Sequence, residues 1–328
     1  MTPRGSFVAE QRERQGDWFS EHLSDHCGHA GVPYRVPPTQ RLLNLPTQYR
    51  DAAERLFEAK PVIQWHQHAN HGLSSQMCCV NFLLPFSQQP ELLRSWVEHV
   101  IGEPIVEMLP VEEDRAGERW FVTFEWIGEH DYLNEAKPGT VRKRGANATA
   151  ADAAVRFRDL NGRIQLLLIE WKYTEKYGQP LTPGEDGRSN RTRQDRYQGI
   201  YLAPNGPIHA DRGVALDDFF YEPFYQMVRQ QMLAWHTESR EPGVDRVRVL
   251  HLSPSGNRAL HKVTSPTLQR FGDDAFEVFR SLLVNPDDFV SMSIEDAFAP
   301  LANWPEADWY PWLKDRYASL CTETGDSA

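Results

Sequence analysis

An apolar run that leads directly into alternating charges constrains the fold of this chain more than any other feature. Leu166-Leu167-Leu168-Ile169 is apolar at every position, which is typical of a central strand covered on both faces. Glu170-Trp171-Lys172 follows without a break. Side chains two residues apart in a strand project from the same face, so Glu170 and Lys172 point toward one spot at the end of a buried strand. Both charges need partners there, because an unpaired buried charge is costly.

A hairpin signal precedes this strand and supplies a third charged residue. Asn161-Gly162 lies between two apolar runs, which is the strongest short-range signal for a β-hairpin. Folding the chain back at this point brings Asp152 to about the level of Glu170. A strict two-residue turn would instead put Asp152 opposite Trp171, pointing away from Glu170. A shared site therefore requires a three-residue loop or a β-bulge.

Two carboxylates and one lysine at a single site favour metal-dependent cleavage of a phosphodiester. Carboxylates supply the oxygen ligands that a hard divalent ion prefers. A nearby cation orients or activates water and stabilises developing negative charge. The alternative is a structural ion pair at the end of a strand.

The order of these residues resembles the PD-(D/E)XK nuclease superfamily, which has an Asp near the start of one strand, a hairpin, and Glu-x-Lys late in the next strand. The likeness covers roughly residues 91–253. Within the superfamily, three segments look similar to a group of bacterial restriction-endonuclease-like proteins. These segments are Thr149-Ala150-Ala151-Asp152-Ala153, Ile169-Glu170-Trp171-Lys172-Tyr173-Thr174-Glu175, and the helix with Ser74-Ser75-Gln76 and Asn81. One departure is Ala151, which stands where the superfamily's name has proline.

The resemblance implies an α/β fold with a restriction-endonuclease-like mixed sheet, four-stranded at its core and flanked by helices, with helical additions at both ends. It implies Mg²⁺, with Mn²⁺ as a substitute, at Asp152 and Glu170. Lys172 would stand beside the attacking water, which makes these three the catalytic residues. The superfamily often adds a carboxylate from the first core helix. Three residues compete for that role and it stays unassigned: Glu98, Glu125 and Glu135.

Other polar residues are candidates for substrate binding. Arg229 and Gln230 lie on a helix after the active strand, where the superfamily places a helix beside the scissile phosphate. Most of the Tyr221, Tyr225, Arg229 and Met232 stripe on that helix is expected to be core. Gln76 and one or more histidines at 66–71 would line the mouth of a nucleic-acid groove or bond to nearby loops. A zinc site with Cys78 and Cys79 is disfavoured, because adjacent cysteines on a helix point in different directions. Glu175 is expected to be a solvated charge at the strand end.

The net charge of −11 counts against a surface that is basic throughout. It allows a local basic strip along the phosphates, for which Arg142-Lys143-Arg144 and the segment 188–196 are candidates. The alternative is that both are solvated loops.

With 328 residues, the chain is long enough for one large α/β domain. We expect an N-terminal extension at 1–45 and a single nuclease domain at 46–328. Without an apolar run of membrane-spanning or signal-peptide length, the expected location is the cytoplasm, with no membrane partner. The four cysteines are interpreted as buried thiols.

Periodicity and turn residues predict the other elements. A long surface loop is predicted from Tyr177 to Asn205. Strands are predicted at 120–127, 153–157, 164–173 and 247–252, and helices at 47–59, 74–85, 91–101, 217–236, 265–283 and 309–320.

These observations favour a metal-dependent endonuclease that hydrolyses DNA, with a role in restriction or defence that rests on the resemblance alone. One alternative is a nuclease acting on RNA, which would use the same site. Another is a catalytically inactive nucleic-acid-binding subunit of a larger complex. The expected partners are DNA and either a second copy of the chain, since cutting two strands often needs a symmetric dimer, or other subunits of a defence complex.

Overall fold

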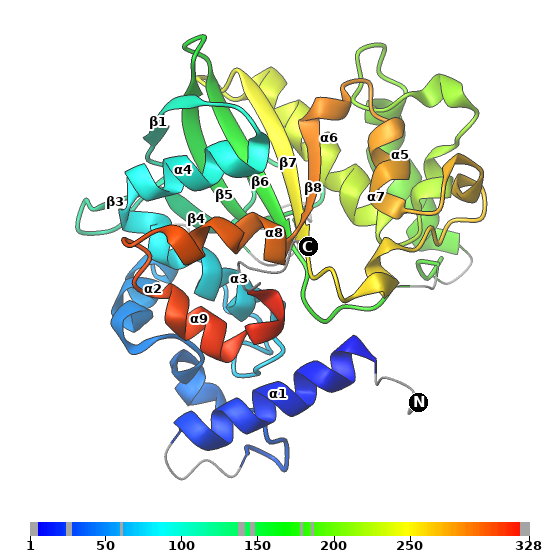
Figure 1. Cartoon of the computed structure of the whole chain (residues 1–328). Coiled ribbons are helices and arrows are strands. Elements are labelled where there is room, and N and C mark those ends of the chain that lie inside the picture. Colours follow the sequence, from blue (N-terminus) through cyan, green and yellow to red (C-terminus); the bar gives the residue numbers. More distant parts are fainter. Residues whose placement is uncertain are drawn as a thin grey trace, which may run out of the picture.

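A six-stranded mixed sheet lies between two layers of helices in the computed structural model (Figure 1). The structure describes residues 6–23, 28–59, 62–136, 142–144, 148–177, 180–184 and 187–321. The order of the strands is β1-β5-β6-β7-β8, and β4 also pairs with β5. The strands β6, β7 and β8 are parallel, whereas β5 is antiparallel to β1, β4 and β6. Their bounds are β1 (Ile105–Leu109), β4 (Val122–Trp126), β5 (Ala151–Asp159), β6 (Ile164–Trp171), β7 (Arg246–Ser253) and β8 (Phe289–Ser293).

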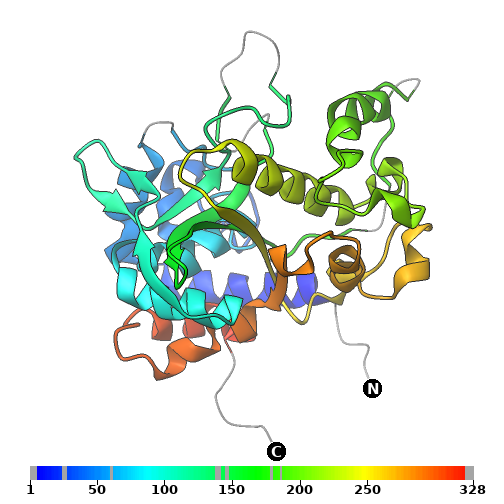
Figure 2. The ribbon, with the colours of Figure 1, turned by 90° about the horizontal axis from the view of Figure 1, so that it is seen from above.

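Helices cover both faces of this sheet, as Figure 2 shows from above. One face packs against α2 (Arg50–Phe57), α3 (Ser75–Leu83), α4 (Pro90–Ile101), α8 (Ile294–Phe298) and α9 (Tyr310–Arg316). The other packs against α5 (Arg188–Tyr201), α6 (Phe224–Arg240) and α7 (Ala275–Ser281). In β6, Leu167 and Ile169 enter the first core and Leu166 and Leu168 the second. The apolar run is therefore a strand buried on both faces, and the predicted mixed α/β fold is confirmed.

The hairpin between β5 and β6 has the loop that the active-site hypothesis required. Arg158 pairs with Ile164, and the Asp159 amide donates to the Arg163 carbonyl at 2.9 Å. A three-residue loop, residues 160–162, therefore connects Asp159 to Arg163. The last of them, Gly162, has φ of 78°, a left-handed conformation that glycine adopts without a Cβ clash.

One predicted loop is wrong, because much of 177–205 is helical. The helix α5 occupies Arg188–Tyr201 and buries Tyr197, Ile200 and Tyr201. Ile200 and Tyr201 follow Tyr197 by three and four residues, which puts all three side chains on one helix face. The loop prediction rested on the many Arg, Asp and Gly residues of this segment, which obscure the three apolar positions. The burial of one stripe stabilises the helix in spite of its polar composition.

The predicted helix at 217–236 begins later than expected. A short 3₁₀ helix spans Leu216–Phe219, and α6 begins at Phe224, directly after Pro223. A residue before proline is disfavoured in the helical region, so Pro223 separates the two elements. At the other end, α6 continues to Arg240.

Two further predicted elements are interrupted. The helix predicted at 265–283 is a 3₁₀ turn at Leu268–Phe271 followed by α7, with Gly272 between them and the Asp274 side chain capping α7. The strand predicted at 120–127 is divided between β4 and a short β3 (Arg119–Trp120), which pairs with β2 (Glu112–Glu113).

The N-terminal helix α1 (Phe7–His22) lies against α9 near the C-terminal end of the described chain (Figure 1). The boundary at residue 45 stays a prediction. Cys78, Cys79 and Cys321 are buried thiols, as predicted, and Cys27 lies outside the described residues. Within the described ranges, no helix has the length and apolar character needed to cross a membrane.

Candidate active site

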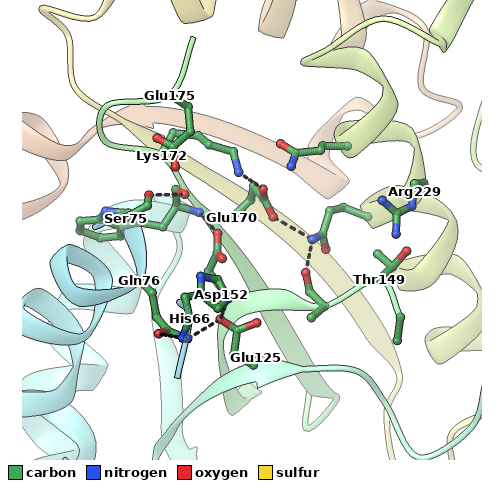
Figure 3. Close-up of a pocket in the computed structure, with 15 residues that line it drawn as sticks. His66, Ser75, Gln76, Glu125, Thr149, Asp152, Glu170, Lys172, Glu175 and Arg229 are labelled. Carbon is green, nitrogen blue, oxygen red and sulfur yellow. Dashed lines mark hydrogen bonds and ion pairs between the residues drawn. The ribbon is translucent and has the colours of Figure 1, made fainter. Parts of the chain in front are cut away.

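Three carboxylates stand in one row across adjacent strands. Ala153 of β5 pairs with Phe124 of β4 on one side and Ile169 of β6 on the other. One residue further along each strand, the same register aligns Glu125, Asp152 and Glu170. All three line one cleft at this end of the sheet (Figure 3).

The cleft has a volume of about 390 Å³ and is lined by the predicted catalytic and substrate-binding residues, which are Asp152, Glu170, Lys172, Gln76, Arg229 and Gln230. Asp152, Glu170 and Lys172 come from the strand ends. The α3 side contributes His66, Ser75 and Gln76, and the α6 side contributes Gln226, Arg229 and Gln230. This placement puts the residues in reach of one ligand, while their roles stay predictions.

The two charges at the end of β6 are buried and satisfied. The Lys172 ammonium forms an ion pair with Glu170 Oε1, and each side chain is only 8% exposed. The other carboxylate oxygen of Glu170 accepts from Gln230 Nε2 at 2.8 Å, and the same amide nitrogen donates to the Ala150 carbonyl at 2.7 Å. Gln230 thus ties α6 to both β6 and the start of β5.

Asp152 has less support. Its Oδ2 accepts from the Trp171 amide at 2.7 Å. Burial raises the pKa of Asp152 well above its usual value, and the neighbouring Glu170 raises it further. Burial lowers the pKa of Lys172, but the carboxylates of Glu170 and Asp152 more than offset this, and the pKa is raised. Lys172 is therefore a cation suited to neutralising charge and orienting water, not a free base.

The donor set fits a hard divalent cation. Asp152 and Glu170 offer carboxylate oxygens in a cleft where negative charge exceeds positive charge, which is what Mg²⁺ prefers. Among the described residues, no group of three or more His, Cys, Asp or Glu side chains is arranged to hold a metal ion. Waters and substrate oxygens would therefore complete the shell, as is usual for Mg²⁺.

The three candidates for a further acidic ligand have different positions. Glu98 lies outside the cleft lining and accepts from the Ile105 amide at 3.0 Å. Glu135 accepts from Thr149 Oγ1 at 2.9 Å and pairs with Arg229 at 3.0 Å. Glu125 alone of the three lines the cleft, and His66 and Gln76 bind its Oε1.

Contacts with the rest of the fold limit what other predicted residues can do. Arg229 is held by Glu135, which leaves its side chain 23% exposed at the edge of the cleft. Glu175 lines the cleft instead of being fully solvated, and accepts from the Tyr173 amide at 2.6 Å. Gln76 bonds to Glu125 and to the backbone of 64 and 66, so it shapes the α3 wall.

The two basic clusters also differ. Arg144 is buried and pairs with Glu112 at 2.6 Å, so the prediction of a basic strip at 142–144 is wrong for that residue. The side chain turns inward because it satisfies carbonyl groups of β4. On α5, Arg188 and Arg191 are exposed and remain candidates for phosphate contact.

The sequence predicted that one or more histidines at 66–71 line the mouth of a groove with Gln76, but it did not single out His66 and assigned no role to Ser75. Ser75 Oγ donates to the Trp171 carbonyl at 3.2 Å and so fastens α3 to the end of β6. The available signal was the capping serine pair before an apolar helix, which fixes where α3 begins but not what it touches.

Comparison with known proteins yields one relationship. A family model described as "Restriction Endonuclease associating with ARP" matches residues 12–318, which is nearly the whole chain. No curated protein and no solved structure matches.

Proposed function

Because the chain belongs to the family of restriction endonucleases associating with ARP, we propose that it is a metal-dependent endonuclease that hydrolyses DNA phosphodiester bonds in the cleft at the end of β5 and β6. One observation carries this proposal. The hairpin register aligns Asp152 with Glu170, and Lys172 pairs with Glu170 in the same cleft. This arrangement supplies metal-binding oxygens and a fixed cation within a single site.

Each residue has a distinct task in this proposal. Asp152 and Glu170 hold Mg²⁺, for which Mn²⁺ can substitute, and the ion supplies Lewis acidity and lowers the pKa of water when bound. Lys172 stays protonated, orients the attacking water and offsets charge that develops on the phosphate. Gln230 fixes the carboxylate of Glu170 from the side of α6.

The proposed biological setting is restriction or defence. The family description names association with ARP, and we extend such a partner to this chain as part of the proposal. DNA is the proposed substrate, with its phosphates contacted by the exposed arginines of α5.

Cleavage assays test the proposal directly. Supercoiled plasmid, linear duplex, single-stranded DNA and RNA are incubated with Mg²⁺ or Mn²⁺ and the parent protein, Asp152→Ala or Lys172→Ala. We expect metal-dependent cutting of DNA and a loss of about a hundredfold or more in both variants. Lys176→Ala is the matched control, because Lys176 is exposed and outside the cleft lining. Failure of the parent protein to cut any substrate, with no Mg²⁺ binding by calorimetry, would reject the enzyme.

A binding measurement separates the enzyme from a non-cleaving binding subunit. The affinity for duplex DNA of the parent protein, Arg188→Gln and Arg191→Gln is measured at several salt concentrations in the presence of Ca²⁺. Each variant should lower the slope of log affinity against log salt by about 1, because one phosphate contact is lost. Arg12→Gln, at an exposed position on α1, should leave the slope unchanged. Retained binding in a protein that never cuts would favour the binding subunit.

A further inference from the structure

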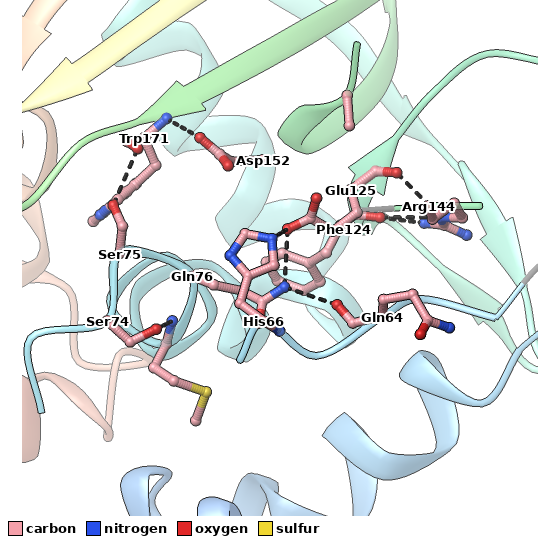
Figure 4. Close-up of polar contacts among 12 residues, drawn as sticks. Gln64, His66, Ser74, Ser75, Gln76, Phe124, Glu125, Arg144, Asp152 and Trp171 are labelled. Atoms are coloured by element: carbon pink, nitrogen blue, oxygen red, sulfur yellow. Dashed lines mark hydrogen bonds and ion pairs between the residues drawn. The ribbon is translucent and has the colours of Figure 1, made fainter. Parts of the chain in front are cut away.

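His66 is held at the mouth of the cleft by contacts on several sides (Figure 4). Its backbone amide donates to Gln76 Oε1 at 2.8 Å. The preceding Trp65 stacks on Phe57 of α2, with ring centroids 3.7 Å apart. Ile63 forms an isolated bridge with Arg144 beside β4. The imidazole therefore projects from a fixed segment.

Glu125 orients the ring of His66. Nε2 of His66 lies 3.0 Å from Glu125 Oε1, and the same oxygen accepts from Gln76 Nε2 at 2.9 Å. The Glu125 side chain is 5% exposed, whereas that of His66 is 42% exposed, so the pair has a buried anchor and an accessible ring.

The backbone of Glu125 is unusual. Its φ of 50° lies in the left-handed region, which is unfavourable for a non-glycine residue. Such conformations persist where the surroundings require them and are concentrated at functional sites. Here the residue with this conformation has a buried carboxylate that binds two residues of the cleft wall, His66 and Gln76.

The ionic surroundings of His66 favour its cationic form. The hydrogen bond to Glu125 raises the pKa of His66, burial opposes this, and the charge of Glu125 adds to the rise. Of the other charged groups that face the ring, Lys172 lowers the pKa and Glu175 raises it.

The position of His66 along the row of carboxylates gives it a chemical role. Adjacent strands are about 4.8 Å apart, so Lys172 at the Glu170 end and His66 at the Glu125 end flank Asp152 from opposite sides. In an in-line displacement, the attacking and leaving oxygens lie on opposite sides of phosphorus. With water at the Lys172 end, the leaving oxygen lies toward His66.

We propose that His66 is the general acid that protonates the leaving sugar oxygen, with Glu125 and Gln76 as its positioning residues. The inference rests on the proposed nuclease function. In this step the water oxygen bonds to phosphorus, the bond from phosphorus to the sugar oxygen breaks, and His66 gives its proton to that oxygen. The attacking water loses a proton to solvent, and His66 regains one from solvent.

A substrate with a bridging sulfur tests the step. Sulfur replaces the sugar oxygen that product analysis identifies as the leaving group, because a thiolate departs without protonation. His66→Gln should slow cleavage of the oxygen substrate by about 10²–10³-fold while changing cleavage of the sulfur substrate several-fold at most. His130→Gln is the matched control, since His130 is exposed and outside the cleft lining.

The pH profile gives a second readout. In the parent protein, kcat/KM for the oxygen substrate should fall at high pH as His66 loses its proton. This limb should move to lower pH in Glu125→Gln, because the carboxylate that supports the cation is gone. It should disappear in His66→Gln.

The outcomes are distinct. A parent protein that cuts neither substrate overturns the proposed function, and the inference with it. A parent protein that cuts while His66→Gln retains full activity overturns only the role of His66. Equal slowing of both substrates by His66→Gln, in a variant with unchanged thermal unfolding, also overturns the general acid and makes His66 a binding group.

Discussion

Asp152 occupies a position that burial and a neighbouring carboxylate make unfavourable for a negative charge. Its pKa is raised mainly by burial and then by Glu170, and the Trp171 amide is the hydrogen-bond donor to its carboxylate in the described structure. Active sites commonly retain such groups at the expense of stability. A bound cation would offset the repulsion between the carboxylates of Asp152 and Glu170. The same carboxylate therefore destabilises the metal-free fold and serves the proposed metal binding.

Asp152→Asn should therefore remove cleavage and, without metal, stabilise the fold by about 1–2 kcal/mol at pH 8. An asparagine oxygen can still accept from Trp171. The raised pKa means that at Asp152 the native state binds more protons than the unfolded state above about pH 4, so the contribution of this residue to the free energy of unfolding falls as pH rises through this window. Urea unfolding from pH 4 to pH 8 should therefore show the free energy of unfolding of the parent falling relative to that of the variant.

Asp159→Asn is the matched control with the opposite sign. Burial raises the pKa of Asp159, but hydrogen bonds from Gln165 and Arg163 outweigh it, and the pKa is lowered. That carboxylate stabilises the fold above its unfolded pKa, and the contribution is lost as pH falls. A destabilising Asp152→Asn would contradict the prediction.

The sequence predicted the central site residues because their placement is local. A strand period of two aligns Glu170 with Lys172, and a short hairpin sets the level of Asp152. The role of Glu125 could not be chosen, because strand pairing between β4 and β5 crosses a long connection. His66 depends on the bridge between Ile63 and Arg144, a long-range contact that no local pattern encodes.

At the scale of elements, the errors follow from competition between composition and packing. The helix α5 was predicted as a loop because its residues are mostly polar, yet Tyr197, Ile200 and Tyr201 bury one stripe. The strands β4, β5, β6 and β7 were predicted more accurately, because apolar strands and an Asn-Gly turn determine structure over few residues, whereas β1 and β8 were not predicted.

Two glycines in these elements should respond oppositely to the same substitution. A Cβ added at Gly162 or Gly199 meets no atom within 4 Å, so sterics with neighbours contribute to neither change. Gly162→Ala should destabilise by about 1 kcal/mol, because φ of 78° disfavours any L side chain. Gly199→Ala in α5 should stabilise by about 0.5–1 kcal/mol, because alanine loses less backbone entropy in a helix.

Chemical denaturation of both variants gives the comparison, and cleavage rates per folded molecule should remain those of the parent. If both substitutions raise or both lower the free energy of unfolding, the hairpin loop or α5 differs in solution from the structure.

At the scale of the whole molecule, both ends of the described chain meet around one buried cation. Arg316 of α9 is 2% exposed, and its guanidinium donates to Gln15 Oε1 at 3.2 Å and to Asn44 Oδ1 at 2.7 Å. The ring of Trp18 lies 4.6 Å from it, close enough for a cation–π contact. Gln15, Trp18 and Asn44 all precede the boundary predicted at residue 45.

Removal of residues 1–45 should therefore destabilise the remaining chain and lower its melting temperature, because Arg316 loses both hydrogen-bond partners and part of its aromatic cover. The loss should be several kcal/mol, as for a buried charge deprived of its partners.

In the full chain, Arg316→Met should lower the free energy of unfolding by a few kcal/mol, because it leaves the polar side chains of Gln15 and Asn44 without their hydrogen-bond partner. In the shortened chain, Arg316→Met should be nearly neutral, because the partners are already gone and the two changes are not additive. Thermal unfolding of the four proteins measures this coupling. If the shortened chain unfolds at the temperature of the full chain and cuts DNA as fast, residues 46–328 form an independent domain and α1 is an appendage.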